Sequence, residues 1–107
     1  MAENKFFSSP SVDVIEKSTK IVGDIFSKAD FRIDGEVEGT ITTSGKVVVG
    51  NNGKISGKLN CSNADISGNV SGTIEVSETL SLMSESYIKG EIATGKLSVE
   101  EGAQVCL

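Results

Sequence analysis

Aliphatic residues recur along the chain in a five-residue unit. An aliphatic, a polar residue, a glycine, a second polar residue and another aliphatic follow one another. The unit occurs twice in succession in ISGNVSGTI at 66–74 and again in IDGEVEGTI at 33–41. Further copies begin at Ile21, Ile55 and Ile88. A unit that returns at near-regular spacing is typical of a repeat architecture, in which each copy packs mainly on its neighbours.

The spacing between copies predicts the length of one structural repeat. Copies that begin at Ile21, Val37, Ile55, Val70 and Ile88 are separated by 16, 18, 15 and 18 residues. Within a copy the aliphatic residues fall at even spacing with polar residues between them. This is the two-residue period of a strand with one buried face. No segment carries apolar residues at sustained helical spacing, which argues against a helical repeat.

Short polar stretches separate the aliphatic runs. They are rich in Ser, Asn, Gly and Thr, which suit corners of the chain, and they cover residues 42–46, 50–54, 61–65, 83–87 and 92–96. Short strands joined by corners, without two-residue hairpin turns, argue against an antiparallel meander. The pattern therefore predicts an all-β fold, a single-stranded parallel β-helix (β-solenoid) of about five to six coils, each of 15–18 residues.

The same parity predicts which side chains point into the solenoid. The expected core is aliphatic, with Cys61 as a small apolar member. Its members include Ile33, Val37, Ile41, Val47, Val49, Ile55, Leu59, Ala64, Ile66, Val70, Ile74, Val76, Leu80, Leu82, Ile88, Ile92, Leu97 and Val99. Gly35 and Gly39 share the inward parity, and we expect the wall to bend, or backbones to approach closely, at these two positions.

The composition leaves this core thin, and a thin core favours assembly. The chain has twelve glycines, one proline, four phenylalanines, one tyrosine and no tryptophan. Each end of a parallel solenoid also leaves a row of unpaired N–H and C=O groups beside an apolar column. We therefore expect copies to stack through Phe26 and Phe31 at one end, and through Val105 and Leu107 at the other. The alternative is a capped monomer.

The charge restricts the kinds of partner that the chain could bind, and the cysteines indicate the cellular compartment. The net charge is −5, and the lysines and arginine form no cluster, which argues against a nucleic-acid partner because phosphate binding needs a concentrated basic face. Cys61 and Cys106 lie far apart in a chain without a signal peptide. We therefore expect free thiols and a cytoplasmic, reducing location.

The first residues differ from the rest of the chain. Residues 1–14 are expected to form a flexible tail, and residues 15–107 the β-helix, with its first strand from Ile15 onward. Within the tail, Lys5, Phe6 and Phe7 could attach to a membrane, since aromatic rings enter the headgroup boundary and lysine meets anionic lipid. The alternative is a disordered terminus without a membrane contact.

Catalytic, cofactor and metal sites are not expected. Gly90 to Leu97, GEIATGKL, has the glycine and lysine spacing of a phosphate-binding loop, but no Ser or Thr follows Lys96 and no helical pattern comes after it. The chain has no histidine, and its carboxylates converge on no one point. We therefore predict a protein that is not an enzyme and uses no nucleotide, cofactor or metal.

Several segments together resemble one protein family. IDGEVEGTITTSGKVVVGNNGKISGKL, ISGNVSGTIEV and IKGEIATGKLSVEEGA resemble the bactofilins, bacterial polymer-forming cytoskeletal proteins. The likeness covers Ile21 to Ala103, and it is most specific at Asp34 to Gly39 and Leu97 to Ala103. It implies a right-handed β-helix of about six coils, filaments formed end to end without nucleotide, and a scaffold at the inner membrane for cell-wall enzymes or chromosome-segregation proteins.

The resemblance also bears on single residues. It places Val105 where many members carry a phenylalanine in the polymer contact, and Lys5 to Ser8 where they carry a membrane motif in another order. The predicted function is thus a self-assembling scaffold that is its own main partner, with lipid and envelope proteins as further partners. One alternative is a binding solenoid that does not polymerise. The other is a solenoid acyltransferase, which would use a histidine and a strict six-residue repeat that this chain lacks.

Overall fold

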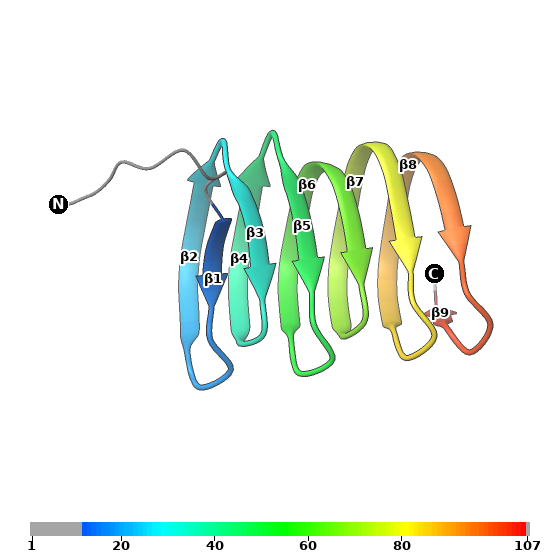
Figure 1. The fold of residues 1–107 in the computed structure, drawn as a ribbon, viewed down its shortest axis with the longest axis horizontal. Coiled ribbons are helices and arrows are strands. Elements are labelled where there is room, and N and C mark those ends of the chain that lie inside the picture. Colours follow the sequence, from blue (N-terminus) through cyan, green and yellow to red (C-terminus); the bar gives the residue numbers. More distant parts are fainter. Residues whose placement is uncertain (1–11, 107) are drawn as a thin grey trace, which may run out of the picture.

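The chain winds into a solenoid whose coils stack side by side from the N-terminal to the C-terminal end (Figure 1). The structure is a computed structural model that describes residues 12–106. Its strands are β1 (Val12–Ile15), β2 (Lys20–Ser27), β3 (Asp30–Ile33), β4 (Glu36–Thr43), β5 (Lys46–Val49), β6 (Lys54–Ile66), β7 (Asn69–Leu82), β8 (Tyr87–Val99) and β9 (Gln104–Cys106). These strands pair in parallel within one sheet. The predicted all-β solenoid is confirmed, with about six turns.

The strand register places the repeated units on top of one another. Ile21 pairs with Val37, and the same column continues through Ile55, Val70, Ile88 and Val105. The unequal steps along the chain therefore correspond to one position of successive coils. The predicted repeat is confirmed residue by residue.

The core is the stack of these inward columns. Fully buried members include Ile33, Ile41, Leu59, Ile66, Ile74 and Leu80, and Cys61 and Ala64 are buried among them. Each inward side chain lies above and below inward side chains of the neighbouring coils. Burying a Val, Leu or Ile side chain contributes roughly 1.5–3 kcal/mol, so the columns are the main source of stability.

A column of glycines runs through the same coils. Gly23, Gly39, Gly57, Gly72 and Gly90 pair in register and have φ between +126° and +138°. A Cβ on any of the last four would overlap the backbone carbonyl of the glycine in the preceding coil. Only glycine satisfies both the backbone angle and the close approach.

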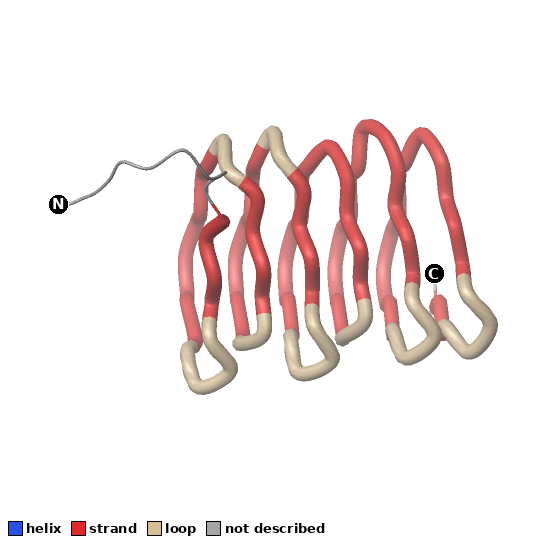
Figure 2. The backbone as a smooth tube through the Cα atoms, viewed as in Figure 1, coloured by secondary structure: helices blue, strands red, loops and turns tan. Residues whose placement is uncertain are grey.

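Two of the predicted corners are formed by strand residues and not by loops. Residues 61–65 lie inside β6 and residues 92–96 inside β8, and the upper corners of the later coils are drawn as strand in Figure 2. At these places Ser62 and Gly95 each face two residues of β7, Ser77 and Glu78. Such a β-bulge turns the strand without interrupting its pairing, so the polar composition does not produce a loop.

The first strand is also displaced from its predicted position. It ends at Ile15 instead of beginning there, because Val12–Ile15 pairs in register with Asp30–Ile33. The residues that follow form a turn, in which the Thr19 N–H donates to the Glu16 carbonyl oxygen at 3.0 Å. Turns on this edge are longer at 16–19, 50–53, 83–86 and 100–103, and shorter at 34–35 and 67–68.

Candidate functional site

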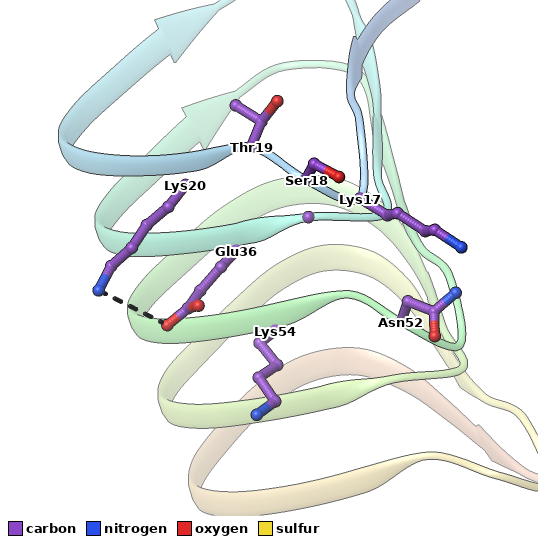
Figure 3. Close-up of a pocket in the computed structure, with 8 residues that line it drawn as sticks. Lys17, Ser18, Thr19, Lys20, Glu36, Asn52 and Lys54 are labelled. Carbon is purple, nitrogen blue, oxygen red and sulfur yellow. Dashed lines mark ion pairs between the residues drawn. The ribbon is translucent and has the colours of Figure 1, made fainter.

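A notch on the side wall is one place where a small molecule could contact the protein. The short turn 34–35 lies between two longer turns and leaves a hollow of about 270 Å³ (Figure 3). It is lined by Lys17, Ser18, Thr19, Lys20, Gly35, Glu36, Asn52 and Lys54. Lys20 Nζ lies 2.9 Å from Glu38 Oε2 and 4.0 Å from Glu36 Oε2, and both carboxylates raise the pKa of Lys20. The lining offers ammonium, hydroxyl, amide and carboxylate groups, but no hydroxyl in it is hydrogen-bonded to a base that could activate it as a nucleophile.

The phosphate-loop-like segment has a structural role in this fold. Residues 90–97 lie within β8, and Gly90 belongs to the glycine column. Within residues 12–106, no cluster of three or more His, Cys, Asp or Glu residues could hold a metal ion. The repeated spacing, and not phosphate binding, accounts for this glycine.

The two cysteines differ in their surroundings. Cys61 is a free thiol in the core, and burial raises its pKa to about 11. Cys106 is a free thiol in the exposed strand β9. A thiol that is both buried and protonated at neutral pH is a poor nucleophile, so Cys61 acts as a small core residue.

The C-terminal end exposes the ends of several apolar columns. Leu97 and Val99 are 52% and 50% exposed, whereas Leu80 and Leu82, their partners in the preceding coil, are fully buried. Val105 continues the column of Ile88 and is 39% exposed. Strand β9 covers only Tyr87 to Lys89 of the coil before it, so the rest of β8 has no further strand beside it in residues 12–106.

The N-terminal end is formed by strands with one paired edge. Strand β2 pairs with β4, and β1 with β3. Ile21 and Ile25 of β2 end two inward columns and are partly buried against the core. Within residues 12–106, the edge without a paired strand and the ends of the columns together make this the second surface on which another chain could stack.

The two phenylalanines predicted for this end occupy different environments. Phe31 is 7% exposed and belongs to the inward column of Val47. Phe26 is 79% exposed and belongs to an outward column, where its partner is Thr42. Phe31 therefore supports the core, while Phe26 lies on the side wall of the first coil.

Sequence reasoning placed Leu97 and Val99 in the core and missed their exposure. The signal was available, because within residues 12–106 no repeat pairs with this part of β8. Of the predicted contact residues, Leu107, Lys5, Phe6 and Phe7 lie outside the described residues. No helix within residues 12–106 has the length and apolarity to cross a membrane.

Comparisons with known proteins agree with this geometry. A family model described as "Bactofilin: Polymer-forming cytoskeletal" matches residues 13–106. Two proteins of Myxococcus xanthus (strain DK1622) are similar. The bactofilin BacP is 31% identical over 90% of this chain, and the bactofilin BacO is 29% identical over 84% of it. The chain spans 41% of the length of BacP and 71% of that of BacO.

A solved structure shares the fold. It is an arginine-for-phenylalanine variant of a bactofilin from Thermus thermophilus, matched with a TM-score of 0.79 and 24% sequence identity. The match covers 84% of this chain and 100% of that one. The fold is therefore shared.

Proposed function

The chain belongs to the bactofilin family of polymer-forming cytoskeletal proteins, and from this premise we propose that it assembles end to end into filaments. Assembly needs no nucleotide, and the filament serves as a scaffold at the inner face of the cell membrane. There it positions proteins of the cell envelope. The chain acts as a structural protein and not as an enzyme.

The observation that carries this proposal is the set of uncovered columns at the C-terminal end. Leu97, Val99 and Val105 are aliphatic residues at positions that are buried in the interior coils. Covering them with another copy removes apolar surface from water at about 25 cal/mol per Å². The same contact brings a partner to the open edge of β8, so burial and strand pairing favour the same geometry.

Assembly without nucleotide follows from the nature of this contact. The surface that makes the contact is apolar and is already formed in the folded chain, so no bound phosphate is needed to create it. The segment at Gly90 to Leu97 that has phosphate-loop spacing lies within strand β8 and continues the repeat. A filament built this way is controlled by protein concentration and by the chemistry of its ends.

The membrane role rests on the tail and on the family. Lys5, Phe6 and Phe7 offer one cation and two aromatic rings per copy, a weak contact alone. A filament displays many copies along one line, so weak contacts add through multivalency. We propose that the membrane binds filaments more tightly than single copies. We also propose that client proteins of the envelope bind the outward faces of the coils.

Two variants of β9 test the assembly. Val105→Arg places a charge in the contact, whereas Gln104→Arg adds the same charge to an exposed neighbouring residue of the strand. We expect the unmodified chain and Gln104→Arg to sediment and to show filaments by electron microscopy without nucleotide. Val105→Arg is expected to remain in the supernatant. A monomer at every concentration of the unmodified chain would overturn the proposal and favour a binding solenoid that does not polymerise.

Vesicle flotation tests the membrane role separately. Filaments of the unmodified chain are expected to float with anionic vesicles, and a variant with Lys5, Phe6 and Phe7 replaced by serine is expected to stay at the bottom while still sedimenting as filaments. Equal flotation of the two proteins would contradict the role of the tail. Flotation of Val105→Arg to the same extent would contradict the role of multivalency.

A further inference from the structure

One inward column of apolar side chains ends in a charged side chain at the N-terminal end of the solenoid. It runs from Asp13 through Phe31, Val47, Ala64 and Leu80 to Leu97. The four members between the ends are buried and apolar, whereas Asp13 is exposed and carries a carboxylate. The column therefore ends in an aliphatic side chain at one end of the rod and in a carboxylate at the other.

The side chains around Asp13 offer its carboxylate only one hydrogen-bond donor among residues 12–106. Ser27 Oγ donates to Asp13 Oδ2 at 3.4 Å, a long hydrogen bond, and accepts from the Ala29 N–H at 3.0 Å. The cation on the next strand, Arg32, points outward and is paired with Asp34 Oδ2 at 3.0 Å. Among residues 12–106, the exposed Asp13 carboxylate therefore has one long hydrogen bond, and water solvates the rest of its exposed surface.

A second copy that stacks on this end has to displace that water. Removing an ionised carboxylate from water is costly unless a cation or several hydrogen-bond donors replace the water. Nothing comparable opposes a contact at the other end of the same column, where Leu97 is aliphatic. The cost applies whichever end of the neighbouring copy arrives, because it belongs to Asp13 itself.

We propose that Asp13 is a charged gate on the N-terminal end: its carboxylate opposes stacking there and makes this the weaker of the two ends. A neighbour binds there strongly only when it brings a cationic group to the carboxylate. The inference rests on the proposed end-to-end assembly and assigns the two ends different strengths. Every contact that uses the N-terminal end is then weakened by Asp13.

A pair of matched variants tests the gate. Asp13→Asn removes the charge with almost no change in size. Asp24→Asn removes one charge from an outward, exposed position of the same coil, where the register partner is Thr40. We expect Asp13→Asn to lower the critical concentration for sedimentation at least about tenfold, and Asp24→Asn to change it less than about twofold. Equal effects of the two variants would overturn the proposal.

The N-terminal contact can also be measured alone. In a Val105→Arg background we expect Asp13→Asn, and likewise Asp13→Val, to form dimers by analytical ultracentrifugation where Asp24→Asn stays monomeric. Monomers for both Asp13 variants, with far-ultraviolet circular dichroism unchanged, would overturn the gate. If the unmodified chain never assembles, the proposed function fails by itself, and the Asp13 comparison in this background still decides whether the carboxylate blocks the end.

Discussion

At the scale of single residues, the size and polarity of each inward side chain are constrained by the side chains that it contacts in the adjacent coils. Ile74, for example, lies in a column with Leu59 before it and Ile92 after it. A side chain of the wrong size or charge therefore disturbs two neighbouring coils as well as its own. The glycine column follows the same rule, with the backbone of one coil setting the limit for the next.

The glycine column provides a matched test of close approach. Gly57 and Gly23 both have φ of +132°, but a Cβ at Gly57 would overlap the carbonyl oxygen of Gly39, whereas one at Gly23 would meet nothing within 4 Å. We expect Gly23→Ala to cost about 1–3 kcal/mol of folding free energy from backbone strain, and Gly57→Ala to cost clearly more. Urea denaturation followed by circular dichroism measures both. Equal losses would mean that strain alone explains the column.

Thiol chemistry tests the placement of the two cysteines. Because Cys61 is buried and its pKa is raised to about 11 from an ordinary value of 9.0, it is protonated and shielded at pH 8. We expect a thiol reagent such as DTNB to modify one cysteine per folded chain, and two after denaturation. Mass spectrometry should locate the first modification at Cys106. Rapid modification of Cys61 in the folded chain would contradict its burial.

At the scale of elements, strand β9 covers only part of the coil before it. It pairs with the first residues of β8, and no other strand in residues 12–106 lies beside the remainder of that coil. The apolar end is therefore made by two strands, since Leu97 and Val99 come from β8 and Val105 from β9. The apolar surface of the C-terminal end is therefore formed by several stacked columns and not by one segment of the chain.

Removing β9 tests this interpretation. A chain that stops after Ala103 loses Val105 but uncovers Ile88, an aliphatic residue of the same column that is buried in the intact chain. We expect the shortened chain to sediment as filaments, although Val105→Arg does not, because the new end is again apolar. Sedimentation assays of the two proteins at equal concentration compare them. A shortened chain that stays monomeric would show that β9 itself is required.

At the scale of the whole molecule, assembly brings together copies that repel one another. Each chain carries a net charge of −5, and its side walls hold surface ion pairs such as Lys46–Asp65 at 2.8 Å and Lys58–Glu75 at 3.6 Å. Exposed pairs of this kind contribute little to stability. The long-range effect of charge on assembly is therefore the repulsion between like-charged rods.

Salt should consequently favour assembly. Raising the ionic strength shortens the Debye length to about 10 Å at 0.1 M, which weakens repulsion between copies but leaves the apolar contact intact. We expect the sedimented fraction to rise as sodium chloride increases from about 20 mM to about 150 mM. A fall in that fraction would indicate that ion pairs between copies, and not apolar columns, hold the contact.

Much of the fold could be predicted because its information is local. The parity of Ile33, Val37 and Ile41 marks the inward face, and the returning unit marks the start of each coil, so strands, columns and core follow from spacing. Whether the corners at 61–65 and 92–96 are strand or loop could not be predicted, because a bulge inside a strand and a loop between strands use the same polar residues.

The sequence by itself determined the solenoid, its period and its inward residues, because in a parallel stack each coil contacts only the next and the alternation of side chains is enough to align them. Only the tertiary structure decided what the ends present. It shows that Phe31 is buried and Phe26 is on the side wall, that Leu97 and Val99 are uncovered, and that Asp13 ends an apolar column. These properties depend on which residues have a partner in the adjacent coil. The register between coils decides those partners, and the order of residues along the chain does not.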